Sequence, residues 1–575
     1  MSRREACISA GVVFLLALAV RVAAAAAVTF PVPEDTAYYA GVARNLVEGR
    51  GLISDALWSY QTQPLVVPRA AFEVWMPLPS LLAAIPIAVV GVANWFRAAQ
   101  VMSVLASSAV AVLAWRLGAD VAAEMHLPVG RARTIGVGTG LIAAVLGPLA
   151  LYGALPDSTA LFAALSLAAC LLMTRIASGE AGATGGGAAR PGVPTGTGAA
   201  EAGRSVGFAA NVAGRLDSRL IALGVVLGLA ALTRSEAIWL ALAWAAVAWF
   251  WTPGSRRRRL LLIAAPAVVA ILVFAPWAVR DWQAFGTPLP GQTLANALYV
   301  HDYDIFAYQD QPSLARYLAQ GPAALVGAHL AGIVHDLLDD LMIPAFPVSL
   351  LGMLALPWVG RCRALRPLVL TSVLTFTVTS LVFPVATLSG TYLHAAGSAL
   401  VLLTVCCMVA LDWFIVRVKK LRRWTRPVAW LGPVFAIAAV GPLCVLTIDG
   451  IAHQADDVRG RYEALPAAMV RAGAPLDGTR PVITNHPIWL AESTRVPALA
   501  LPEESPVAVL DLAHHFGAKL LIVQGDVNGE WPDILRQGGT AANCFQEVPL
   551  TDSSGEIPGP DSPLAGIMVF RIVCP

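Results

Sequence analysis

Charged residues are scarce in this sequence. Only 13% of its 575 residues are Asp, Glu, Lys or Arg, whereas soluble domains average about 25%, and 57% are hydrophobic. The net charge is only +2, which excludes the broad basic surface that nucleic-acid binding needs. The chain also has no C-x-x-C pair and no Cys/His cluster with zinc spacing, so no structural zinc site is expected. The composition instead predicts a polytopic α-helical membrane protein.

Cysteine is also infrequent, and most of it has a simple explanation. Six of the eight cysteines lie in or beside apolar runs, where cysteine acts as a small hydrophobic residue. Cys544 and Cys574 alone sit in polar sequence. If their side of the membrane is oxidising they are free to form a disulfide. Two free thiols fit the sequence equally well, because the spacing is not diagnostic.

Long hydrophobic runs are what the sequence has in abundance. A membrane-spanning helix needs about 20 apolar residues. A shorter run at 78–92 carries a proline in its middle, and we expect it to lie in the membrane interface. Eleven runs meet the length test, although 219–233 and 237–252 need their flanks. They are 6–28, 97–117, 134–153, 158–176, 219–233, 237–252, 260–278, 342–359, 367–386, 395–415 and 427–449.

The basic residues indicate which loops face the cytoplasm and which face outward. With 78–92 counted as interfacial, the clusters at 3–4, 116–133, 175–219, 255–260, 361–366 and 417–426 all fall on one side, and Lys/Arg-rich loops stay in the cytoplasm. Counting 78–92 as a span would put SRRRRL at 255–260 outside. We therefore predict a bacterial-type plasma-membrane protein with a cytoplasmic N-terminus and an extracytoplasmic C-terminus.

This map divides the chain into a transmembrane domain at 1–449 and an outer domain at 450–575. Residues 178–215 are rich in Gly and Ala with few large apolar side chains, and we expect a flexible cytoplasmic linker there. The last 125 residues include helix-like PVAVLDLAHHFGA, strand-like KLLIVQG and a closing GIMVFRIV. This order predicts a small extracytoplasmic α/β domain.

The outer loop at 29–96 carries the most informative motif. From Glu34 to Gly51 the pattern is E-D-x-x-Y-Y-x-x-x-A-R-N-L-x-x-G-x-G, and VWMPLPSLL follows. This resembles the start of the GT-C glycosyltransferases that use polyprenyl-phosphate sugars, such as the protein O-mannosyltransferases and the lipid A aminoarabinose transferases. The resemblance implies a GT-C fold, here of about eleven transmembrane helices plus an interfacial helix, and a polyprenyl-phosphate sugar donor held in the membrane lipid.

Further motifs follow in the family's order over roughly the first 290 residues. LYGALPDSTALF places Asp157 in a second outer loop, LTRSEAIWLAL contains Arg234 and Glu236, and FAPWAVRDWQAFGTPLP contains Arg280. There are two departures. The family's Lys/His-Pro-Pro-Leu is here MPLP at 76–79, and its later Arg-Tyr is replaced by TYLH at 391–394.

Asp35, with Glu34 beside it, is the candidate catalytic base. A carboxylate beside apolar walls has its pKa raised toward the working pH, which suits removal of a proton from an acceptor hydroxyl. The competing explanation is that the acidic pair only caps the helix TAYYAGVARNLVEG, since Asp before a helix accepts backbone N–H bonds. The resemblance favours the catalytic role.

Three arginines at the outer ends of spans are candidates for binding the donor phosphate: Arg97, Arg280 and Arg234. A guanidinium offers a fork of donors that matches phosphate oxygens. An arginine at a helix end can equally reach lipid headgroups. Arg97 and Arg280 are favoured over Arg234, because Glu236 is a ready partner for Arg234.

Other residues are candidates for contacts with the acceptor or the sugar. Asp157 is one, with a helix cap as its alternative role, and two carboxylates from separate outer loops could also hold a divalent cation. The aromatic and acidic stretch HDYDIFAYQD at 301–310 suits stacking on a sugar. The full set of acceptor or sugar candidates is Asp157, Tyr38, His301, Tyr392 and His394.

The sequence thus predicts an inverting glycosyltransferase that acts at the outer face. A catalytically inactive relative that serves as an assembly subunit is the main alternative, because it would inherit the same carboxylates. A lipid flippase or transporter is disfavoured, since the spans have few charges at their centres and neither half repeats the other. The residues do not identify the sugar, or whether the acceptor is a glycan, a lipid or a protein.

Overall fold

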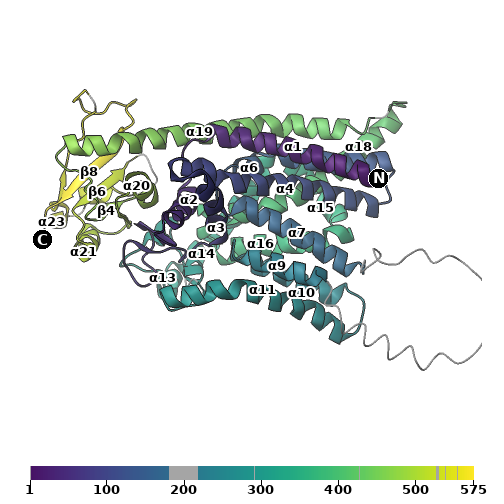
Figure 1. Cartoon of the computed structure of the whole chain (residues 1–575), viewed down its shortest axis with the longest axis horizontal. Coiled ribbons are helices and arrows are strands. Elements are labelled where there is room, and N and C mark those ends of the chain that lie inside the picture. Colours follow the sequence, from purple (N-terminus) through teal and green to yellow (C-terminus); the bar gives the residue numbers. More distant parts are fainter. Residues whose placement is uncertain are drawn as a thin grey trace, which may run out of the picture.

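The computed structural model describes residues 2–179, 218–289, 292–426, 428–525, 530–537, 539–552 and 554–574. Among the described residues before 450, most belong to apolar helices. The linker predicted at 178–215 lies outside these ranges, apart from its first two residues. Each of the eleven predicted apolar runs overlaps a helix. The long helices lie roughly parallel, with the N-terminus at one end of the bundle and a small sheet at the other (Figure 1). We call the second end the sheet end.

Eight helical stretches are long and apolar enough to cross a membrane, and the protein is therefore a polytopic membrane protein. They contain α1 (Arg3–Ala27), α4 (Trp95–Glu124), α7 (Thr159–Ala177), α11 (Arg256–Phe285), α14 (Gly321–His335), α16 (Arg366–Val382), α18 (Gly397–Leu421) and α19 (Leu431–Arg471). Shorter helices complete the bundle: α3 (Leu78–Val90), α5 (Val129–Val145), α6 (Gly147–Leu151), α9 (Ser218–Ala231), α10 (Ala237–Phe250) and α15 (Val348–Val359).

The sequence test places no membrane-spanning run between 278 and 342, and this is wrong for the last third of that segment. Gly321–Ala345 is one of the eight apolar stretches. The sequence test missed it because its apolar part, GPAALVGAHLAGIV, has only 14 residues and is followed by three aspartates. The helical stretch continues through those aspartates as a π-helical turn, η3 (Asp336–Met342).

Local sequence signals explain where the helices begin and end. The side chain of Ser255 accepts the backbone N–H of Arg258 at the start of α11, as an N-cap does. The same helix ends at Gly286, whose φ of 71° lies in the left-handed region that glycine adopts without strain.

The C-terminal segment forms a six-stranded mixed sheet in the order β2-β5-β4-β6-β8-β7. Its strands are β4 (Val482–Thr484), β5 (Ala498–Ala500), β6 (Leu520–Gln524), β7 (Phe545–Glu547), β8 (Ile567–Ile572) and the two-residue β2 (Ala56–Leu57). Helices α20 (Pro487–Thr494) and α21 (Pro506–Phe516) pack against it. The segments KLLIVQG and GIMVFRIV supply the antiparallel pair β6 and β8.

The sheet is not built from the C-terminal residues alone. Strand β2 comes from the first predicted outer loop and pairs in parallel with β5, with Ala56 opposite Ala498. Helix α19 has 41 residues, about 60 Å at 1.5 Å per residue, and continues beyond the predicted span at 427–449 to reach the sheet. The predicted boundary at 449–450 therefore falls inside a continuous helix.

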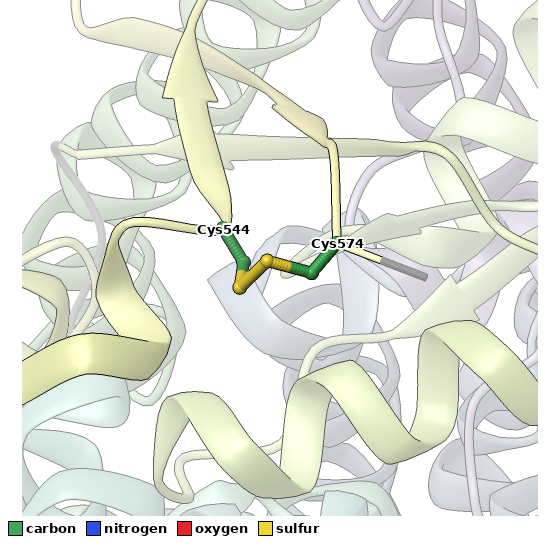
Figure 2. The surroundings of a disulfide bond; sticks show 2 residues. All are labelled: Cys544 and Cys574. Atoms are coloured by element: carbon green, nitrogen blue, oxygen red, sulfur yellow. A yellow bond between two sulfur atoms is a disulfide. The ribbon is translucent and has the colours of Figure 1, made fainter.

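Cys544 and Cys574 form a disulfide, with their Cα atoms 5.1 Å apart (Figure 2). Cys544 directly precedes β7, and Cys574 follows β8, so the bond ties together the ends of two adjacent strands. Of the two alternatives that the spacing left open, the structure has the disulfide.

Candidate functional site

Helix α2 (Glu34–Val47) places the acidic pair at the sheet end of the bundle. The helix begins at Glu34 itself, after Pro33, and neither Glu34 nor Asp35 makes a capping hydrogen bond. The capping explanation for the pair is therefore wrong: these residues occupy the first turn, not the cap position. Carboxylates in the first turn are still favoured by the helix dipole. Both side chains line a cavity, with 20% of the Glu34 and 29% of the Asp35 side chain exposed.

Contacts with the C-terminal domain hold α2 in place. The backbone N–H of Trp489 donates to Glu34 Oε1 at 3.2 Å. Arg44 forms a buried ion pair with Glu492 and also donates to its backbone carbonyl. Helix α20 comes so near α2 that a Cβ at Gly41 would lie 2.1 Å from the Glu492 carboxyl carbon. Glycine at this position is thus required for the close approach.

A cavity of about 560 Å³ opens beside the acidic pair. Its wall combines residues from the first loop, the α9–α10 connection, the 296–306 segment, the 386–394 segment and the C-terminal domain. The residues are Glu34, Asp35, Trp58, Val74, Trp75, Arg234, Asn296, Tyr299, Asp302, Tyr303, Ile305, Phe306, Ala386, Ser389, Thr391, His394, Ile488 and Glu530. Charged groups and aromatic rings therefore share one space.

His394 is the titratable side chain paired with Asp35. Its Nε2 lies 3.5 Å from Asp35 Oδ2, while its Nδ1 lies 2.7 Å from the hydroxyl of Thr159. The backbone N–H of Thr159 in turn donates to Asp157 Oδ1 at 2.8 Å. The two predicted acidic residues from separate loops are thus connected through a histidine and a threonine.

Arg234 is the guanidinium that lines the cavity in the described part of the chain. Its Nη2 donates to Glu236 at 2.5 Å, its Nε donates to the same carboxylate at 3.2 Å, and its Nη1 donates to Ser158 at 2.9 Å. Nη2 also donates to the carbonyl of Thr391 at 3.2 Å. These bonds fix a planar cation in the cavity wall.

Burial sets the protonation states of Asp35, Asp157 and His394. It raises the pKa of Asp35 to about 6, against the opposing field of Arg234 and with a smaller contribution from Glu34. Burial also raises the pKa of Asp157 to about 8 and lowers that of His394 to about 3. At neutral pH Asp35 is therefore mostly ionised, Asp157 mostly protonated and His394 neutral.

The other two predicted phosphate ligands lie outside the cavity wall. Arg97 donates to the carbonyls of Ala25, Ala26 and Val28 and so satisfies the end of α1. Arg280 donates to the carbonyl of Ala71 at 2.7 Å and to Asp281 at 2.9 Å. Both side chains serve as anchors between elements in this structure.

Four of the five predicted acceptor or sugar residues are also away from the cavity wall, and only His394 lines it. Asp157 is 2% exposed and reaches the cavity only through Thr159 and His394. Tyr38 is 1% exposed, and its hydroxyl accepts the N–H of Phe72 at 2.7 Å. Tyr392 is 1% exposed and packs on Phe376. His301 is exposed and stacks on Tyr303, which does line the cavity.

The sequence did not single out the main aromatic surface of the site. Trp58 and Trp75 stack with ring centroids 4.2 Å apart and both line the cavity, as does Tyr299. Their signal was weak, since each is one aromatic residue in an irregular loop. The stretch 301–310, which the sequence analysis predicts to stack on a sugar, contributes Asp302, Tyr303, Ile305 and Phe306 to the cavity wall.

The carboxylates of this site do not form a cation cage. Asp35 and Asp157 belong to no group of three or more His, Cys, Asp or Glu side chains, among the described residues, whose ligand atoms lie close enough for a shared metal ion. Asp157 uses one oxygen on a backbone N–H, and Arg234 already supplies a cation to the cavity. We therefore assign no step to a metal here.

Structural comparison shows what the fold is similar to. The oligosaccharyltransferase of Archaeoglobus fulgidus, solved with zinc and sulfate, superposes with a TM-score of 0.55 at 12% identity, over 94% of this chain and 71% of that one. ArnT of Cupriavidus metallidurans, bound to undecaprenyl phosphate, gives 0.52 at 13% identity over 98% of both chains. Both are GT-C glycosyltransferases. The chain has the GT-C fold.

At these identities the likeness establishes the fold alone. No protein-family model and no curated protein matches the sequence. A fold does not by itself imply an activity, so the residues of the cavity have to support any statement about what the protein does.

The packing of α2 leads to a test of stability. Replacing Glu492 with Ala leaves Arg44 buried without its ion-pair partner, a change that typically costs about 3–5 kcal/mol. We expect the thermal unfolding midpoint of the purified protein, followed by tryptophan fluorescence, to fall clearly. Gly41→Ala should act in the same direction, because the added Cβ meets the Glu492 carboxylate.

Glu48→Ala is the matched control for this test. Glu48 pairs with Arg495 across the same α2–α20 contact, but that pair is partly exposed, and such pairs contribute about 0–1 kcal/mol. Equal midpoints for Glu492→Ala and Glu48→Ala would contradict the role given to the buried pair.

Proposed function

We propose that this protein is an inverting GT-C glycosyltransferase, which moves a sugar from a polyprenyl-phosphate donor to an acceptor at the sheet end of the bundle. The observation that carries the proposal is the cavity itself. It brings an ionisable Asp35, the fixed cation Arg234 and a wall of aromatic rings together at the end of a membrane-spanning bundle. A base, a phosphate ligand and a sugar surface are what such a transfer requires.

Asp35 is the proposed general base. Its pKa of about 6 leaves it ionised at neutral pH and still basic enough to accept a proton. The acceptor hydroxyl loses its proton to Asp35 as its oxygen bonds to the anomeric carbon of the sugar. The bond from that carbon to the phosphate oxygen breaks, and its electrons leave with polyprenyl phosphate. One displacement on the opposite face inverts the anomeric centre.

Arg234 is the proposed phosphate ligand, in place of Arg97 and Arg280. Charge on the departing phosphate rises in the transition state, and a cation already fixed in position stabilises it without reorganisation. The bonds to Glu236 and Ser158 hold the guanidinium in that position. Trp58, Trp75 and Tyr303 provide flat apolar surfaces against which a sugar ring can stack.

A second hollow supports a lipid-linked donor. An apolar cavity of about 600 Å³ lies on α11 and is lined by Ala231, Ala270, Ile271, Phe274, Ala275, Ala278, Val279, Trp282, Gln283 and Pro288. Because its lining is almost entirely apolar, this cavity suits a hydrocarbon chain. A donor anchored by its tail presents its phosphate only at the membrane surface, where the acidic pair lies. The ArnT comparison, with bound undecaprenyl phosphate, supports the same class of donor.

The orientation is part of the proposal. The α10–α11 and α18–α19 junctions, which hold the strongest basic runs, lie at the same end as the N-terminus (Figure 1). The positive-inside rule supports a cytoplasmic location for that end and an extracytoplasmic one for the sheet. The disulfide in the sheet suits an oxidising compartment.

The first test removes the base. Asp35→Asn keeps the size of the side chain but cannot accept the proton, so turnover should fall by about 10² or more while donor binding persists. In the unmodified protein, kcat/KM should be highest above pH 6 and fall as the pH drops through about 6, because protonation of Asp35 removes the base. Transfer from radiolabelled polyprenyl-phosphate sugars measures both.

Glu48→Gln controls for the loss of a carboxylate at the C-terminal end of α2, away from the cavity. Unchanged turnover in Asp35→Asn would remove this residue from the mechanism. Absence of transfer by the unmodified protein with every donor tried, together with intact donor binding, would favour the assembly-subunit function.

The second test assigns the phosphate ligand. The double variant Arg234→Gln/Glu236→Gln removes the cation without leaving an unpaired buried carboxylate. Loss of a charged hydrogen bond of about 1.5–3 kcal/mol should weaken undecaprenyl-phosphate binding about tenfold to hundredfold. Glu236→Gln alone and Arg280→Gln serve as controls. Weaker binding in Arg280→Gln than in the double variant would return the role to Arg280.

A further inference from the structure

A second acidic group lies outside the Asp35 cavity. It consists of His335, Asp336 and Asp340, and one ligand atom from each lies within 4.8 Å of the others. None of the three lines the cavity. We call this set the η3 cluster, because Asp336 and Asp340 belong to that π-helical turn and His335 directly precedes it.

The backbone brings these side chains together. A π-helical turn has i→i+5 hydrogen bonds and is wider than an α-helical one, so residues four apart stay on one side. That side faces inward: Asp336 is 0% exposed and Asp340 is 3% exposed. Two carboxylates are thus buried side by side in a stretch that is otherwise apolar enough to cross a membrane.

Hydrogen bonding accounts for one carboxylate only. Asp336 accepts from the hydroxyl of Ser380 at 2.6 Å and from that of Thr387 at 2.5 Å. Asp340 has a buried oxygen, Oδ2, with no hydrogen-bond partner in the described structure. Among the described residues, no ion pair joins Arg or Lys to either carboxylate. His335 Nδ1 lies 3.1 Å from Oδ2 of the exposed Asp339, which leaves Nε2 of His335 for a ligand. A buried oxygen that is charged and has no partner is costly, so this carboxyl group either binds a proton or meets a ligand such as a cation.

The chemistry of the three ligands selects the type of ion. Two carboxylate oxygens and one imidazole nitrogen suit a divalent transition metal such as Zn²⁺ or Mn²⁺. Ligand bonds of about 2.0–2.2 Å put neighbouring ligand atoms about 3–4 Å apart, so separations within 4.8 Å need only small rotations. The serine and threonine hydroxyls already orient Asp336, as outer partners of a metal ligand do.

We infer that the η3 cluster binds one divalent transition-metal cation. The ion joins the turn after α14 to α16 and to the 386–389 segment, through Asp336 and its two hydroxyl partners. That segment leads into α17 (Thr391–Ala395), which carries His394. The cation would therefore stabilise the packing of the segment that forms one wall of the cavity. This inference does not depend on the proposed glycosyl transfer.

The test measures metal bound to the full chain in detergent. Protein stripped with EDTA is dialysed against ZnCl₂ or MnCl₂, and its metal content and thermal midpoint are recorded. We expect one cation per chain and a higher midpoint with metal than without. Asp340→Asn keeps the shape of the side chain and should weaken binding at least about tenfold. His335→Ala should act in the same direction.

Asp449→Asn is the matched control. Asp449 and His453 form an exposed pair four residues apart on α19, so they carry the same residue types without burial. Metal content equal to that of the unmodified protein is expected there. Unmodified protein that binds no cation and whose midpoint ignores EDTA would overturn the inference, and the two carboxylates would then share a proton. Retention of the metal in both Asp340→Asn and His335→Ala would also overturn it.

Discussion

The whole site depends on the position of one short helix. Helix α2 carries Glu34 and Asp35 at its first turn, and it is held between the bundle and the C-terminal domain by the buried Arg44–Glu492 pair and by strand pairing of the loop that follows it. Because Gly41 has no side chain, α20 can lie directly against α2. The C-terminal domain is therefore part of the site, and it also contributes Ile488 and Glu530 to the cavity wall.

Two opposed electrostatic effects set the pKa of Asp35 at this position. Burial in an apolar, partly aromatic cavity raises the pKa of Asp35, and Arg234 lowers it, with a result near 6. A fully exposed carboxylate would be too weak a base, and one paired directly with the guanidinium would be weaker still. In the structure the guanidinium is neutralised by Glu236 instead, so Asp35 remains available while the cation stays in the same cavity.

Local patterns in the sequence located the apolar runs other than Gly321–Ala345, the acidic pair, and the cavity-lining stretch at 301–310. Contacts between distant segments leave no such local pattern. Arg97 and Arg280 looked like phosphate ligands, but both bond to backbone carbonyls, whereas Arg234, which looked occupied by Glu236, lines the cavity. The addition of Ala56–Leu57 to a sheet more than 400 residues away, and the stacking of Trp58 on Trp75, have no signature in the sequence.

The most direct test is an experimental density map of the protein with undecaprenyl phosphate bound. We expect the phosphate to lie within hydrogen-bonding distance of Arg234, the head of the lipid to point toward Asp35, and the tail to follow the apolar cavity on α11. A phosphate bound at Arg97 or Arg280 with the Asp35 cavity empty would contradict this expectation.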